Sequence, residues 1–190
     1  MKIQYTYDTE IKHKVFRPEE LMYNEFENCI FRDCDFSACD FLAVVFVECT
    51  FYSCNFNAAK INYVCFRTAI FIDTDFTSVN FSMCNPLVFE VHFEGCTLDF
   101  SKFYNLKMKR TTFKDSRLIA VDFMNADLTE AVFSNCDLYR AVFDKTMLVK
   151  ADFMTAYHFT IHPEKNKLKK ALFSRMNLKG LLDAYEIQVV

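Results

Sequence analysis

An aromatic or isoleucine side chain recurs at every fifth position between Phe26 and Phe81. The residues on this spacing are Phe26, Phe31, Phe36, Phe41, Phe46, Phe51, Phe56, Ile61, Phe66, Phe71, Phe76 and Phe81. Neither an α-helix, with 3.6 residues per turn, nor an extended strand, with two, has this period. Small or narrow residues lie two positions earlier, at Cys29, Cys34, Cys39, Val44, Cys49, Cys54, Ala59, Val64, Ala69, Thr74 and Val79. One large and one small inward position in every five predict a solenoid of five-residue units.

The same period continues after one change of register. Asn85-Pro86 interrupt it, and it resumes at Phe93, twelve residues after Phe81 instead of ten. From Phe93 to Phe153, Phe alternates with Leu or Met at every fifth position. A fixed internal repeat takes precedence over other assignments. The sequence therefore predicts one domain of repeats over 21–156, with a two-residue insertion or bulge inside 82–92.

The segment before the repeat and the residue after it have different patterns. In 1–20, Ile3, Tyr5 and Tyr7 alternate with polar residues, which predicts an N-terminal strand that caps the solenoid. His158 occupies the next central position after Phe153 and is too polar to continue the apolar stack. We therefore expect the repeat to end at about 156.

Residues 157–190 are predicted to form a turn, a short helix and a strand. Pro163 marks the turn, and Ser174 is a candidate N-cap for a helix over about 175–184. Its apolar residues at helical spacing are Leu178, Leu181, Leu182 and Tyr185. Ile187, Val189 and Val190 suggest the terminal strand. A helix this short is marginal alone, so its apolar stripe needs a partner surface.

The cysteines are expected to be thiols of a cytoplasmic protein. No apolar run approaches the roughly 18 residues that span a bilayer, and the first ten residues lack a secretory pattern. Seven of the nine cysteines occupy the small inward position, where Cys acts as a compact hydrophobe. Cys65 and Cys84 lie off that position and are predicted to be the more reactive thiols.

The residue inventory does not favour an enzyme. Two glycines could hardly build a phosphate-binding loop, and the four histidines are scattered over the chain. His158 and His162 suggest a metal site at first, but no thiol or carboxylate completes one, and a role in the terminal turn is favoured. No catalytic residue, metal ligand or cofactor is expected.

Acidic side chains concentrate in the first half of the repeat. Residues 25–100 hold eleven acidic and three basic residues, whereas 101–190 hold ten acidic and fifteen basic ones. Five of the acids follow central residues by one or two positions and should face solvent, namely Asp33, Glu48, Asp73, Glu94 and Asp99. Acids that precede central residues, such as Asp35 and Asp75, can instead bond turn backbone. The sequence leaves open whether this surface binds a partner or only confers solubility. The basic cluster at Lys165–Lys170 lacks interleaved aromatics, so a solvated face is favoured over a nucleic-acid patch.

The five-residue unit resembles that of the pentapeptide-repeat family, which is often summarised as Ala-Asp/Asn-Leu/Phe-X-X. The segments Ala151-Asp152-Phe153, Ala126-Asp127-Leu128 and Cys39-Asp40-Phe41 carry the resemblance, which covers about 21–156. It implies an all-β solenoid, a right-handed quadrilateral β-helix with four units per coil, here followed by a short C-terminal α-helix and strand. At twenty residues per coil, Phe93, Phe113, Phe133 and Phe153 should form one column, with Phe103, Phe123 and Phe143 opposite.

Within that family the chain is most similar to the quinolone-resistance (Qnr) and microcin-immunity branch. The similarity rests on length, the Phe- and Cys-rich first half, the Pro163-Glu164-X-Asn166 turn and the Gly180-Leu181-Leu182 segment. It implies a non-enzymatic, DNA-mimicking rod that binds DNA gyrase or topoisomerase IV. Such a rod would protect the topoisomerase from quinolones or a gyrase-targeting toxin. The alternative is a scaffold or binding module for an unrelated protein partner.

The branch also implies two sets of contact residues. The protein would be a homodimer joined end to end, without direct nucleic-acid or membrane partners. The implied dimer contact is Leu178, Leu181, Leu182, Tyr185, Ile187 and Val189. The implied partner-binding acidic surface is Asp33, Asp35, Glu48, Asp73, Asp75, Glu94 and Asp99.

Overall fold

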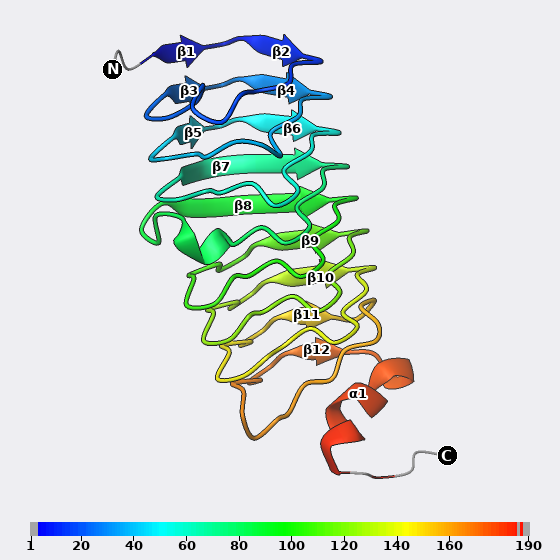
Figure 1. Cartoon of the computed structure of the whole chain (residues 1–190). Helices are drawn as coiled ribbons and strands as arrows, with labels where there is room; N and C mark the ends of the chain where they lie inside the picture. Colours follow the sequence, from blue (N-terminus) through cyan, green and yellow to red (C-terminus); the bar gives the residue numbers. More distant parts are fainter. Residues whose placement is uncertain (1–3, 186, 188–190) are drawn as a thin grey trace.

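The chain winds into a parallel β-solenoid of about eight turns with one short α-helix near its C-terminus (Figure 1). The computed structural model describes residues 4–185 and 187. Its strands are β1 (Tyr5–Tyr7), β2 (Glu10–Lys12), β3 (Glu25–Glu27), β4 (Ile30–Arg32), β5 (Val45–Val47), β6 (Thr50–Tyr52), β7 (Cys65–Ile72), β8 (Phe89–Glu94), β9 (Thr112–Lys114), β10 (Val132–Ser134), β11 (Asp152–Phe153) and β12 (Leu172–Phe173). Its helices are the 3-10 helices η1 (Phe81–Met83), η2 (Arg175–Asn177) and η3 (Asp183–Tyr185), and α1 (Lys179–Leu182). The predicted all-β solenoid is confirmed.

Outside the coil with the insertion, the paired strands repeat every twenty residues, as the columns of Phe and Leu require. Phe26 pairs with Phe46 between β3 and β5, and Phe113 pairs with Phe133 between β9 and β10. Isolated bridges such as Asp127 to Met147 keep the same spacing on the faces without strands. Stacked parallel coils satisfy the backbone of each short strand through its neighbours above and below.

The interior is filled by columns of apolar side chains. Phe113 and Phe133 stack with ring centroids 5.0 Å apart at 7°, and Phe103 meets Phe113 edge-on at 83°. The predicted aromatic columns at 93–153 and 103–143 are therefore confirmed. Leu98, Leu118, Leu138, Met108, Leu128 and Leu148 fill the two remaining columns and are buried. Side chains of these four columns therefore fill the interior of the described coils.

The corners of the solenoid force many residues into the left-handed backbone region. Within residues 4–185 and 187, twenty-six non-glycine residues have positive φ, usually two positions after a central residue, as at Ala58 (φ 56°). Left-handed backbone costs an L-residue roughly 1–2 kcal/mol. The hydrogen-bonded ladders and the packed interior offset that cost at each corner.

The change of register is an insertion between Asn85 and Phe89. The Asn85 N–H still donates to the carbonyl of Val64, twenty-one residues back, as Cys65 does to Val44, but Ile70 pairs with His92, twenty-two residues on instead of twenty. Phe66 pairs with Phe89, and the register shifts between Phe66 and Ala69. The predicted insertion within 82–92 is confirmed, with η1 just before it.

The N-terminal segment forms a coil of its own, which differs from the expected cap. It contains two strands, and both pair in register with the next coil, Tyr5 with Glu25 and Glu10 with Ile30. The Lys14 ammonium lies 4.4 Å from the centre of the Phe16 ring and is paired with Glu20. This pair covers the end of the Phe16 column, since a cation over an aromatic face is favourable.

The rod also continues beyond 156, which corrects the expected end of the repeat. Phe173 in β12 stacks on Phe153 at 5.1 Å and 2°, and Met147 is bridged to Lys167. His158 turns outward with φ 57°, and its neighbour Phe159 is buried in its place. A polar residue at the central position therefore shifts the local register and does not end the stack.

The C-terminal helical segment lies where the sequence predicts it, but it is broken into η2, α1 and η3. Ser174 occupies the N-cap position of η2 without a side-chain capping bond. Among the described residues, no helix is long and apolar enough to cross a membrane. The predicted terminal strand includes Val189 and Val190, which lie outside the described residues.

The cysteines line the interior, with one correction. The Cys49 thiol donates to the carbonyls of Phe26 and Val47, and Cys136 makes the equivalent bonds to Phe113 and Ser134. Cys84 also belongs to this set, because the insertion begins after it and leaves it in the register of Val64. It is 3% exposed, and burial raises the pKa of its thiol well above the usual value. The expected reactivity of Cys84 is therefore wrong, whereas Cys65 is half-buried.

Candidate functional site

One corner of the solenoid carries acidic pairs on alternate coils. Asp33 and Asp35 flank the inward Cys34, and Asp73 and Asp75 flank the inward Thr74. Asp35 is bridged to Asn55, and Asn55 to Asp75, so the two pairs lie two coils apart on the same corner. At ~4.8 Å per coil this separation is about 10 Å. We call Asp33, Asp35, Asp73 and Asp75 the acidic corner.

Short hydrogen bonds hold the carboxylates of Asp35 and Asp75. Asp35 Oδ1 accepts from Ser37 N–H at 2.9 Å, and Asp75 Oδ1 accepts from Thr77 N–H at 2.8 Å and from its hydroxyl at 2.6 Å. These are the turn bonds expected of an Asp before a central residue. Both side chains remain half-buried, so the turns fix the orientation of the carboxylates and still leave part of each at the surface.

The other two carboxylates of the corner face solvent. Asp33 has a side chain 52% exposed and lies 3.6 Å from His13. Asp73 occupies space above Gly95, where a Cβ would come within 2.2 Å of its Oδ1. Across residues 4–185 and 187, no basic side chain forms an ion pair with Asp35, Asp73 or Asp75. Their charge is therefore available to a partner.

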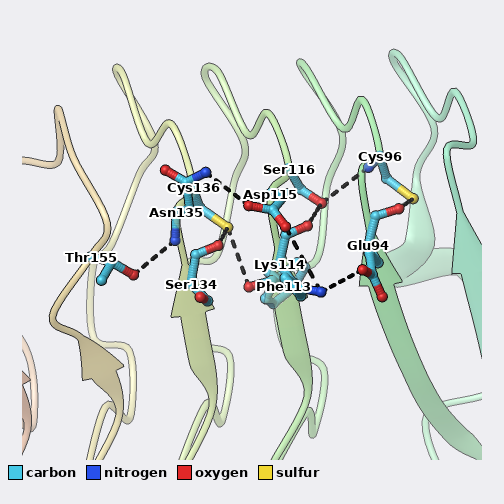
Figure 2. Close-up of polar contacts among 10 residues, drawn as sticks. All are labelled: Glu94, Cys96, Phe113, Lys114, Asp115, Ser116, Ser134, Asn135, Cys136 and Thr155. Atoms are coloured by element: carbon cyan, nitrogen blue, oxygen red, sulfur yellow. Dashed lines mark hydrogen bonds and ion pairs between the residues drawn. The ribbon is translucent and has the colours of Figure 1, made fainter.

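Farther along the corner the charges are neutralised by their neighbours (Figure 2). Glu94 pairs with Lys114 at 2.5 Å, and this hydrogen bond raises the pKa of the lysine. Asn135 donates from Nδ2 to Asp115 at 2.8 Å and from its backbone N–H to Thr155 Oγ1 at 2.9 Å. On this corner, among the described residues, the carboxylates without a basic partner thus lie in the coils above Glu94, since Asp115 has Lys114 at 3.9 Å and Asp137 has His158 at 3.0 Å.

Asp99 does not belong to any exposed surface, contrary to expectation. It is 3% exposed, pairs with Arg117 and accepts the backbone N–H of Ile119 at 3.1 Å. The hydrogen bond to Asp99 raises the pKa of the Arg117 guanidinium. Both partners belong to the next coil, so the Asp99 carboxylate points along the rod toward that coil and not into solvent. Glu48 is exposed, but it lies at the neighbouring corner, separated from the acidic corner by β6.

The predicted dimer residues divide into two groups. Leu178, Tyr185 and Ile187 are exposed by 41%, 45% and 52%, whereas Leu181 packs against the core of its own rod. Leu182 is half-buried, and Val189 lies outside the described residues. Met176, at 94% exposed, adds to the apolar end and was missed because it is off the helical stripe.

Gly180 allows the C-terminal helical segment to pack closely against the last coil of the rod. A Cβ at this position would lie 2.2 Å from the Phe159 carbonyl oxygen and 2.7 Å from its ring. The Ile161 N–H donates to the Gly180 carbonyl at 2.9 Å. Only a residue without a side chain permits this approach. The exposed apolar side chains of the helical segment are consequently presented on a fixed support.

Two family models match the chain. The model described as pentapeptide repeats (8 copies) matches residues 29–67, and the one described as pentapeptide repeat region matches 87–157. Together they cover more than half of the sequence. The chain belongs to the pentapeptide-repeat family. A search of curated protein sequences finds no significant match to this pentapeptide-repeat chain.

Solved structures of pentapeptide-repeat proteins share the fold. Two trypsin-treated variants of QnrB1, described as a plasmid-mediated fluoroquinolone resistance protein, superpose with TM-scores of 0.75 and 0.74. Their identities are 11% and 14%, and the matches cover 98% and 99% of this chain and 99% and 98% of those chains. HetL, described as involved in heterocyst differentiation regulation in Nostoc sp. strain PCC 7120, matches with a TM-score of 0.42. It is 16% identical, over 94% of this chain and 89% of HetL.

Proposed function

We propose that this protein is a non-enzymatic, DNA-mimicking rod that binds a type II topoisomerase, DNA gyrase or topoisomerase IV. In the cytoplasm it would protect that enzyme from quinolones or from a gyrase-targeting toxin. The observation that carries the proposal is the acidic corner. Its two pairs of carboxylates lie about 10 Å apart along the rod, a negative surface of the kind that phosphates form along a duplex, and three of the four have no basic partner among the described residues.

The match to QnrB1 over nearly the whole of both chains supports this proposal. A protein described as conferring fluoroquinolone resistance uses the same rod, although the low identity makes this a likeness of fold. Fluoroquinolones act on type II topoisomerases, and a surface that competes for the cationic DNA-binding groove would act there. Such a contact would depend on charge and weaken as salt screens it.

We further propose that the active form is a homodimer joined at its C-terminal ends. Exposed Leu178, Tyr185, Ile187 and Met176 form an apolar end on a segment that Gly180 holds in place. Packing two such ends together would place the acidic corners toward the two far ends of a longer rod. Two distal negative arms would then reach the two DNA-binding halves of a dimeric topoisomerase.

The test is the supercoiling activity of gyrase in the presence of a fluoroquinolone. The proposal predicts that the purified protein restores supercoiling, and that Asp73→Asn with Asp75→Asn restores at least tenfold less at equal concentration. Asp144→Asn with Asp152→Asn removes the same charge from the second half and should leave rescue intact. Absence of rescue by the native protein, or equal loss in both double variants, would overturn the proposal.

A further inference from the structure

The insertion after Asn85 interrupts the hydrogen bonding between coils on the face that carries Lys107, Asp127 and Met147. Elsewhere on this face the backbone N–H groups of Asp127 and Met147 each donate to the coil above, both at 2.9 Å. Lys107 occupies the equivalent position one coil earlier, and its N–H makes no hydrogen bond to any described residue. Thr112 N–H donates to the His92 ring at 3.4 Å. In Figure 1, no strand continues beneath the first part of β8.

A recess of about 560 Å³ fills the gap, and we call it the slip recess. Its upper wall comes from β7, β8 and the inserted residues, and its lower wall from 107–111. Phe66, Phe89 and Val91 supply buried apolar surface, and Leu87 stands at the rim with 86% exposure. The volume lies within the range of pockets that hold small ligands.

Four cationic side chains line the slip recess, and they come from both walls. Arg67 is above, and Lys107, Lys109 and Arg110 are below. Among the described residues, no ion pair engages Arg67 or Lys107. Lys109 and Arg110 reach Asp127 and Glu130 at 3.4 Å and 3.3 Å, yet their side chains stay 58% and 80% exposed. All four can therefore turn toward a ligand.

Little negative charge opposes these cations. Glu90 is the one acidic side chain that lines the slip recess within the described chain, and its Oε2 accepts a hydrogen bond from Thr68 at 3.2 Å. Unpaired cations with a free backbone N–H form the kind of concavity that binds anions. Arg and Lys together favour phosphate oxygens, Arg through its planar fork and Lys as a point charge.

We propose that the slip recess binds a small phosphate-bearing anion, either inorganic polyphosphate or a nucleotide. Arg67 and Lys107 hold the phosphate groups from opposite walls, with Lys109 and Arg110 at the open side. The apolar wall of Phe66, Phe89 and Leu87 offers contact area for the nucleoside of a nucleotide. This site lies on a different face from the acidic corner and does not depend on topoisomerase binding.

The test is calorimetric titration of the intact protein with pyrophosphate and, separately, with ATP, both without added metal. We expect saturable one-site binding of both, with affinity reduced at least tenfold by Arg67→Gln with Lys107→Gln. Equal affinities would show that phosphate alone is recognised, and tighter binding of ATP that the apolar wall holds the nucleoside.

The matched control is Lys60→Gln with Lys102→Gln, which removes the same charge from the adjoining face. Lys102 has the same place in its five-residue unit as Lys107 and bridges Asp122 as Lys107 bridges Asp127. The control should bind like the native protein. No binding of either probe at millimolar concentration, or an equal loss of affinity in the two double variants, would overturn the proposal.

Discussion

Phe71 and Phe93 stack with their ring centroids 5.4 Å apart at 18°, although twenty-two residues separate them instead of twenty. The neighbouring pairs in the same column, Phe51 with Phe71 and Phe93 with Phe113, lie at 4.8 Å and 5.2 Å. The aromatic column therefore passes the insertion without a gap. The two extra residues are accommodated at the adjoining face, where the slip recess forms.

The aromatic column should dominate the stability of the rod. Phe113→Ala removes a fully buried ring that stacks on Phe93 and Phe133, and the surrounding walls cannot collapse into the space. We expect a loss of about 3–5 kcal/mol in the free energy of unfolding. The control is Phe100→Ala, since Phe100 is 57% exposed and should change stability by no more than about 0.5 kcal/mol. Urea titration followed by circular dichroism measures both, and similar losses would contradict the packing described.

Backbone conformation should decide whether replacing an alanine by glycine raises or lowers the stability of the protein. Ala38 and Ala58 are both exposed and lie one coil apart at the same place in the unit, but only Ala58 has positive φ. Ala58→Gly should stabilise the protein by about 1 kcal/mol, because glycine has no penalty in that region. Ala38→Gly should destabilise it by about 0.5–1 kcal/mol through backbone entropy. Thermal unfolding of the two variants should shift in opposite directions, and a shared direction would refute this explanation.

Alkaline pH should weaken the fold through its buried thiols. Burial raises the pKa of Cys96 and of Cys136 to about 12. In the unfolded chain a thiol ionises near pH 8.5, so their contribution is complete below that pH and is lost as pH rises toward 12. Each thiol should lower the free energy of unfolding by up to about 1.4 kcal/mol per pH unit in that window. Urea midpoints at pH 8 and 10, with reductant, measure the change. Cys96→Ala with Cys136→Ala should show a smaller drop, and an unchanged drop would contradict the assignment.

The dimer contact should depend on exposed rather than buried leucines. Leu178→Asp introduces charge into the apolar end without disturbing the core, and in sedimentation experiments it should be a monomer where the native protein forms the proposed dimer. Leu172→Asp is the control, because Leu172 is 51% exposed on β12, outside the helical segment. A dimeric Leu178→Asp protein, or a native protein that is already monomeric, would exclude this contact.

Periodicity made most of the fold predictable, because each central residue of a solenoid repeats the same environment. The sequence located the insertion from the spacing of Phe81 and Phe93, and it identified the columns that stack. It misplaced both ends of the rod for one reason. Thr6 and His158 are poor central residues, but Thr6 pairs with Phe26 of the next coil, and beyond His158 the pairing resumes between β11 and β12.

The acidic surface was less predictable than the core. Asp73 and Asp99 each follow a unit's apolar positions, yet one is exposed and the other buried. The difference lies in the next coil. Gly95 has no side chain to contact Asp73, whereas Arg117 and the Ile119 backbone N–H both bind the Asp99 carboxylate. Contacts between coils depend on residues about twenty positions away and on the exact register. The slip recess has the same origin, since it needs the insertion and Lys107 together.

Competition with DNA tests the central proposal most directly. The measurement is the affinity of gyrase for a labelled duplex as the protein is added, at two salt concentrations. We predict displacement of the duplex by the native protein, weaker displacement at higher salt, and at least a tenfold loss for the variant with Asp33, Asp35, Asp73 and Asp75 all changed to Asn. Gyrase that keeps its duplex at every concentration of the native protein would contradict DNA mimicry by this rod.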